Sequence, residues 1–181
     1  MPPGPLEVQA LLPLAASRDQ HRAGHELDVH GIYSRSDVLA AIGRSTPEKP
    51  YQHREGVLYM RTLGSDFFFV TLDKAEDRFS PSTRYRDYAI SRTLFHWETQ
   101  SFQGPETKTV QRYIHHREQG GNVFLFVRDA AKSEIGTTSP FLFLGAVDYV
   151  IHKGSRPVGI TWRLRTPMPE ETLRASVAAV G

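Results

Sequence analysis

Residues 66–73 read Asp-Phe-Phe-Phe-Val-Thr-Leu-Asp, and this unbroken apolar run decides the expected fold. A strand that is apolar on both faces must be covered on both faces, so the run predicts a central strand of a sheet. Residues 122–128 (NVFLFVR) and 141–151 (FLFLGAVDYVI) have the same character. In the second of these, Gly145 lies near the middle and predicts a bulge or a tight bend.

Shorter elements are expected around these strands. Residues 57–60 predict a short strand, and residues 157–164 alternate apolar with polar or small side chains. On that second strand Trp162 should face the core and Arg163 the opposite side. The expected class is α+β: a strongly bent, mainly antiparallel sheet or a small β-barrel, PUA-like in outline, with two or three short helices.

Helix signals occur at both ends of this region. Ser34 and Asp37 form a capping-box-like start for a helix over residues 35–42, and Gly43 stands where a helix-ending glycine belongs. Pro169 begins a terminal helical stretch, 169–180, with acidic residues in its first turn.

The composition bounds the function. The chain has 181 residues, no cysteine and a net charge of +2, which excludes disulfides and thiolate metal sites. No apolar run is long enough to span a membrane, and we expect a cytoplasmic protein. Residues 1–28 are interpreted as a flexible arm, or the remnant of a connection to something upstream. Residues 29–181 are interpreted as a single nucleic-acid-binding domain.

Several segments together resemble a known domain family. They are Phe67–Lys74, Phe79–Tyr85, Asp87–Ser91, Leu94–Trp97, Arg112–Arg117, Phe143–Gly145, Asp148–Tyr149 and Ile160–Leu164. They resemble an uncharacterised domain that ends some bacterial superfamily-2 helicase-like proteins and also occurs beside HNH nucleases. The resemblance implies a nucleic-acid context in defence or restriction. The chain has no G-x-x-x-x-G-K-[ST] loop, so no nucleotide cofactor is expected.

The segment 78–117 is the most unusual of the chain. It contains seven arginine and lysine residues against three acidic ones, with aromatic residues and histidines between them. Cations bind backbone phosphates, hydroxyls donate to phosphate oxygens, and aromatic faces stack on exposed bases. The alternative is a solvated basic loop. The candidate phosphate contacts, including two from the basic strand 157–164 and its end, are Arg84, Arg86, Arg112, Arg117, Arg163, Arg165, Ser82 and Thr83.

Phe95-His96-Trp97 suggests a pocket for a base taken out of the helix. On a strand, Phe95 and Trp97 share one face and His96 points to the other. A carboxylate nearby, Asp87 or Asp148, would accept from the exocyclic amine of cytosine. The alternative is that Trp97 is simply core. The candidate pocket residues are Tyr33, Pro81, Tyr85, Asp87, Phe95, His96, Trp97 and Tyr113.

A modified backbone is a second candidate target. The sulfur of a phosphorothioate favours an apolar notch beside a cation. Residues 79–85 could form one, with Pro81 and Tyr85 as walls and Arg84 on the phosphate. The alternative is a plain turn.

Two further function classes stay open. His115, His116 and Asn122, with the distant His152, suggest an HNH-like metal-dependent nuclease, although the spacing is poor. The third class is an adaptor that docks a helicase partner through its aromatic residues. The preferred hypothesis is a reader of modified double-stranded DNA, carrying modified cytosine or phosphorothioate, for a nuclease or helicase. No cofactor and no metal are expected for it.

Overall fold

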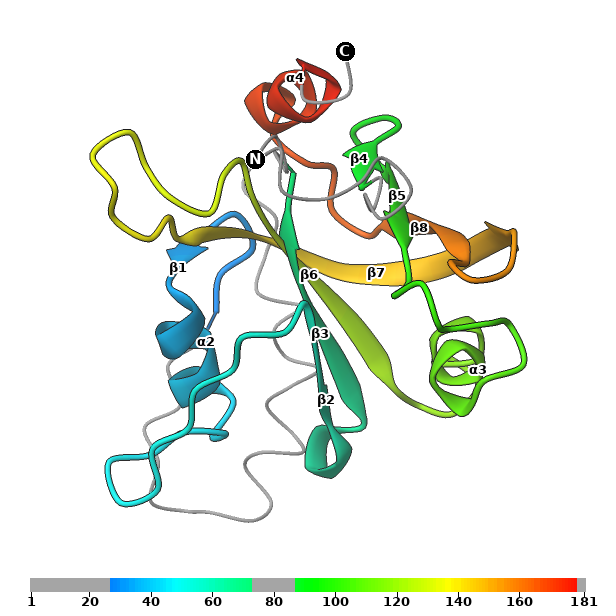
Figure 1. Cartoon of the computed structure of the whole chain (residues 1–181), viewed down its shortest axis with the longest axis horizontal. Coiled ribbons are helices and arrows are strands. Elements are labelled where there is room, and N and C mark those ends of the chain that lie inside the picture. Colours follow the sequence, from blue (N-terminus) through cyan, green and yellow to red (C-terminus); the bar gives the residue numbers. More distant parts are fainter. Residues whose placement is uncertain (1–26, 73–86, 179–181) are drawn as a thin grey trace.

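The protein is described over residues 27–72 and 87–178 in a computed structural model (Figure 1). The expected arm, 1–28, therefore lies almost entirely outside the described residues. Over the described part the class is α+β, as the sequence predicts.

Eight strands form one mixed sheet in the order β2-β3-β6-β7-β8-β5-β4, with β1 pairing β7. Most of its pairings are antiparallel, while β3 and β6 run parallel from Ser65↔Asn122 to Thr71↔Arg128. The sheet is not closed into a barrel: β2 and β4 stand at its two ends. The strands are β1 (Ile32–Tyr33), β2 (Val57–Met60), β3 (Ser65–Thr71), β4 (Tyr88–Ala89), β5 (Leu94–Glu98), β6 (Asn122–Arg128), β7 (Phe141–Lys153) and β8 (Gly159–Leu164).

Three α-helices lie around the sheet in the described ranges: α2 (Arg35–Ala41), α3 (Lys108–Ile114) and α4 (Glu170–Ala178) (Figure 1). A 3-10 turn, η2 (Arg61–Leu63), joins β2 to β3. The predicted capping box is present, because Ser34 Oγ accepts from Asp37 N and Asp37 Oδ2 accepts from Ser34 N. Within residues 27–72 and 87–178, no helix has the length and apolar character needed to cross a membrane.

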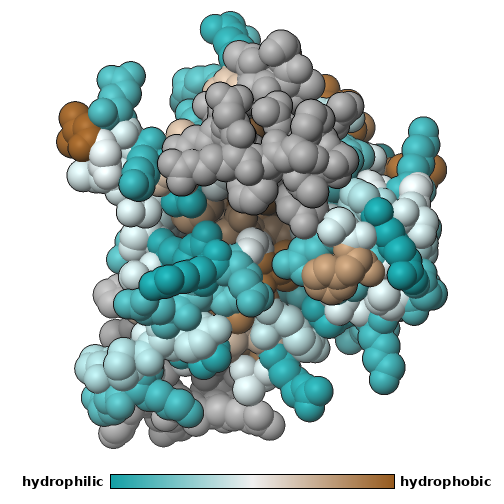
Figure 2. Space-filling view, viewed as in Figure 1, coloured by the Kyte–Doolittle hydropathy of each residue, from teal (hydrophilic) through white to brown (hydrophobic). Residues whose placement is uncertain are grey.

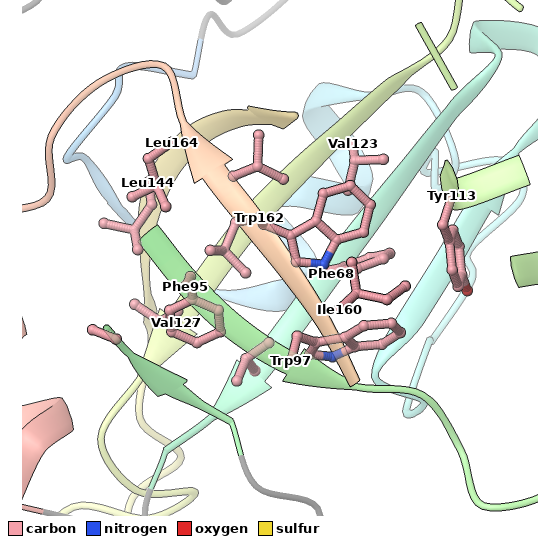
Figure 3. Close-up of a cluster of buried hydrophobic side chains, with 14 of the residues drawn as sticks. Phe68, Phe95, Trp97, Tyr113, Val123, Val127, Leu144, Ile160, Trp162 and Leu164 are labelled. Atoms are coloured by element: carbon pink, nitrogen blue, oxygen red, sulfur yellow. The ribbon is translucent and has the colours of Figure 1, made fainter. Parts of the chain in front are cut away.

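Buried side chains form two clusters, one on each face of the central strands. Phe68 and Val70 point into the first cluster, while Phe67 and Phe69 point into the second, beneath α2. This alternation explains why residues 67–70 are apolar on both faces of the strand. Figure 3 shows the first cluster, with Trp97 and Trp162 inside the bend of the sheet.

The long strand β7 bends at the predicted glycine. Gly145 has φ 88°, a left-handed conformation that side chains with a Cβ rarely adopt. The register with β6 shifts there, from Leu125↔Gly145 to Phe126↔Phe143. The bulge changes the direction of β7 at Gly145, and the bend of the sheet follows from this change of direction.

Candidate nucleic-acid interface

Two hollows lie where β5 comes back towards β2 and β3 without pairing with them. The first has a volume of about 310 Å³ and the second about 180 Å³. Val57, Trp97 and Gln100 line both hollows, so the two lie next to each other. In the view of Figure 2, apolar side chains are visible at the bottom of a hollow in the middle of the face, with hydrophilic side chains on both sides.

One wall of the first hollow carries two arginines. The Arg35 guanidinium carbon lies 4.7 Å from the ring centre of Phe69 and 5.3 Å from that of Phe141. The Arg128 guanidinium carbon lies 4.4 Å from the same Phe141 ring. Both cations therefore rest against one buried aromatic ring at the ends of α2 and β6.

The hydrogen-bond partners of these two arginines are all neutral. Arg35 Nη1 donates to the carbonyl of Glu55 at 2.6 Å, and Arg128 donates to Thr71 Oγ1 and to the carbonyl of Ser139. Neither forms an ion pair with a carboxylate of the described residues. Burial, and then the nearby charge of Arg128, lower the pKa of Arg35 to about 10, and burial lowers the pKa of Arg128. Both side chains stay charged at neutral pH.

The lining of the first hollow also contains an aromatic ring and two carboxyl groups. Trp97, Asp87 and Glu98 all line it. Asp87 Oδ1 accepts from the backbone N of Glu98 at 3.0 Å, which holds the first carboxylate at the end of β5. Arg54, exposed on the loop before β2, adds a third cation to the rim. The hollow thus combines cationic, acidic and aromatic side chains in one lining.

The second hollow contains a matched ion pair. Arg112 Nε and Nη2 donate to the two oxygens of Asp66, both at 2.8 Å, and the Asp66 side chain is 2% exposed. The guanidinium also stacks on Tyr59, at 3.9 Å. Burial raises the pKa of Asp66, and Arg112 offsets part of this rise. Burial lowers the pKa of Arg112, but the hydrogen bonds and charge of Asp66 outweigh it and raise that pKa.

A second matched group surrounds Asp148 on β7. Arg165 donates to both of its oxygens, at 3.0 and 3.1 Å, and Arg117 Nε lies 3.7 Å away. His116 is buried, and its Nε2 lies 3.5 Å from Asp148 Oδ1. Burial raises the pKa of Asp148, but the hydrogen bonds from Arg165 and the charges of Arg165 and Arg117 outweigh it and lower that pKa.

These contacts correct part of the predicted phosphate surface. Arg112 and Arg165 are engaged bidentately by carboxylates of the protein, which leaves them poorly placed to bind a phosphate. Arg163 is exposed on β8, opposite in direction to the enclosed Trp162, as the alternation predicts. Arg117 is also largely exposed, at 70%. Arg84, Arg86, Ser82 and Thr83 lie outside the described residues.

The predicted pocket also needs correction. Phe95 is 1% and Tyr113 3% exposed, and both pack in the first core cluster, although Tyr113 also lines the second hollow. Trp97 is 7% exposed, with its ring centre 4.3 Å from that of Phe68, yet it lines both hollows. The structure does bring Trp97 and Asp87 to one hollow.

The other pocket candidates lie elsewhere. His96 points to the opposite face of β5, where its ring stacks on Tyr88 at 4.8 Å. Tyr33 packs against the second core cluster, which lies beneath α2. Pro81 and Tyr85, and with them the predicted sulfur notch at 79–85, lie outside the described residues.

The histidines of the nuclease alternative do not converge. His115 Nδ1 lies 3.2 Å from Glu118 at the surface, whereas the His116 ring faces Trp162 and Asp148 in the interior. His152 Nδ1 pairs with the hydroxyl of Tyr149 at 2.6 Å. Across the described ranges, no group of three or more histidine or acidic side chains is placed to hold a metal ion.

Arg35 and Arg128 were not singled out by the sequence. Arg128 ends an otherwise apolar strand and Arg35 follows a helix cap, so each reads as an ordinary boundary residue. Of the two, Arg128 was the one that the sequence could have revealed, because a cation at the end of a fully buried strand is half-buried and needs a partner. Their proximity depends on the tertiary fold.

Comparison with known proteins identifies a family for this chain. No curated protein matches the chain. Residues 27–175, most of the chain, match the model of a family described as "Domain of unknown function (DUF3427)". This chain therefore belongs to the DUF3427 family.

Proposed function

We propose that this domain binds double-stranded DNA in the cytoplasm and reads one base displaced from the helix, for a nuclease or helicase partner. The observation that carries the proposal is the lining of the first hollow, which combines arginines with Trp97 and two carboxyl groups. Arginine side chains bind phosphate groups, and the edge of an aromatic side chain can contact a base. A carboxylate accepts a hydrogen bond from an exocyclic amine.

Modified cytosine is the preferred target. The carboxyl groups of Asp87 and Glu98 would accept from the 4-amino group of cytosine, which thymine lacks. The apolar edge of Trp97 supports contact with a methyl group on the same base. The phosphorothioate alternative depends on residues 79–85, which the described structure does not include. The described residues therefore support the modified base, and the modified backbone stays an alternative.

The first experiment measures binding to matched duplexes by fluorescence anisotropy across a range of salt concentrations. The duplexes differ only in one central cytosine, 5-methylcytosine or phosphorothioate linkage. We expect affinity to fall steeply with salt, because binding releases counterions from the DNA, and to be highest for 5-methylcytosine. Undetectable or salt-independent binding would contradict the proposal and favour a protein–protein adaptor.

The two tryptophans of the chain provide a matched pair of variants. Trp97→Phe should weaken binding to the preferred duplex about fivefold, near the lower limit of the roughly 1–3 kcal/mol of one stacked base. Trp162→Phe should leave the affinity unchanged, because Trp162 is fully enclosed and lines neither hollow. In Trp162→Phe the remaining indole, Trp97, should also change its fluorescence on DNA binding. Equal losses in both variants would reject the role of Trp97.

A further inference from the structure

We propose that Arg35 and Arg128 form a phosphate site in the first hollow, and that its ligand is the phosphate of a single nucleotide. The assignment of a nucleotide rests on the proposed function, whereas the phosphate site itself can be tested without DNA. Neither arginine belongs to the phosphate surface that the sequence predicts.

The donors of the two guanidiniums are mostly unused by the protein. An arginine has five N–H donors in a fixed planar arrangement. Arg35 uses one of them, on the carbonyl of Glu55, and Arg128 uses two, on Thr71 and the carbonyl of Ser139. These neutral partners and the ring of Phe141 hold the side chains in place. Donors that are positioned in advance lower the entropic cost of binding an anion.

No carboxylate of residues 27–72 and 87–178 pairs with either cation. Two half-buried cations beside one another repel each other, and burial in addition disfavours their charged forms. An anion between them removes both costs. A phosphate oxyanion accepts hydrogen bonds from guanidinium groups in bidentate geometry, so phosphate is the anion that this arrangement suits best.

The other charged groups of the hollow fix how the ligand would lie. Asp87 and Glu98 also line the hollow, together with the exposed Arg54. The carboxylates repel a phosphate from their side and leave it at Arg35 and Arg128. The volume of about 310 Å³ is at the lower limit for small-molecule sites. It admits one nucleotide and excludes a duplex.

The experiment is a calorimetric titration of the whole chain with inorganic phosphate, dCMP and deoxycytidine, at constant ionic strength. We expect phosphate to bind, dCMP to bind more tightly, and deoxycytidine to bind most weakly. Arg35→Gln and Arg128→Gln should each reduce phosphate affinity at least tenfold. The matched control is Arg163→Gln, which removes the same charge from an exposed position on β8 and should bind phosphate like the wild type.

Melting curves without ligand establish that each variant is folded, and Arg128→Gln alone decides the matter if Arg35→Gln does not fold. Absence of phosphate binding by the wild type, or equal binding by Arg128→Gln and Arg163→Gln, would overturn the site. If DNA binding persists in that case, the proposed function stands without it. If phosphate and dCMP bind but DNA does not, the site stands for small phosphate esters and the DNA proposal is wrong.

Discussion

The two hollows differ in how their arginines are partnered. In the second, Arg112 meets both oxygens of a buried carboxylate at 2.8 Å. In the first, Arg35 and Arg128 meet only neutral groups and aromatic rings. A buried ion pair is costly to break, because removing one charge leaves the other buried without a partner. An arginine that meets only neutral partners among the described residues can be removed at little cost to the stability of the fold. Such a small cost is typical of a side chain that serves to bind a ligand.

The largest effect should come from breaking the matched pair. Arg112→Met should lower the free energy of unfolding by about 3–5 kcal/mol, because it leaves Asp66 buried and uncompensated. The measurement is denaturant unfolding followed by circular dichroism. The double variant Asp66→Leu with Arg112→Met should recover most of the loss, and a double variant as unstable as the single one would contradict this account.

An intermediate effect is expected at the first hollow. Arg35→Met should change the free energy of unfolding by no more than about 1 kcal/mol. The lost hydrogen bond to Glu55 is worth about 1.5–3 kcal/mol, and relief of the burial and repulsion of the charge offsets most of it. The same unfolding assay checks this prediction. A loss as large as that of Arg112→Met would show that the two hollows do not differ in the way described.

A smaller and pH-dependent effect is expected at Asp148. Its folded-state pKa lies below the unfolded value of about 3.9, so its contribution is present above that pH and is lost as the pH falls through the folded value. Asp148→Asn should therefore cost less than about 1 kcal/mol at pH 7, since Arg165 and Arg117 are partly exposed. Unfolding curves from pH 7 to pH 3 should show the difference from wild type shrinking. A difference in the free energy of unfolding that stays constant over this pH range would contradict the lowered pKa of Asp148.

The smallest effect on stability should come from Arg163. Arg163→Ala removes an exposed cation, so the free energy of unfolding should change by less than about 0.5 kcal/mol. If Arg163 contacts phosphate, its loss should weaken all duplexes equally and reduce the salt slope by about one. An altered preference among the duplexes would place Arg163 in base reading instead.

The central strands could be predicted from the sequence because they are long and apolar on both faces. Residues 57–60 and 122–128 form strands with the predicted bounds, and the bulge at Gly145 is confirmed. Helix α3 was not predicted, because only Val110 and Tyr113 of its seven residues are buried. The parallel pairing of β3 with β6 was also not predicted, since nothing local in either strand marks its partner.

The candidate site could be predicted only in part. Trp97 and Asp87 were chosen because an aromatic residue and an acid near a basic segment suggest base recognition; they do line one hollow, and their role stays a prediction. For Arg112 and Arg165 the sequence shows the charge but not the carboxylates that meet them across the fold. Arg35 and Arg128 come from distant elements that only the folded sheet brings together.

The parallel pairing of β3 with β6 has a consequence for kinetics. Both strands must find each other across the whole segment that contains β4, β5 and α3. Pairings between such distant parts of a chain slow folding towards the millisecond-to-second range. The first hollow takes residues from α2, β3, β5 and β6, so it exists only after this step. Phosphate should therefore slow unfolding far more than it speeds refolding, and stopped-flow measurements with and without phosphate would show which rate it changes.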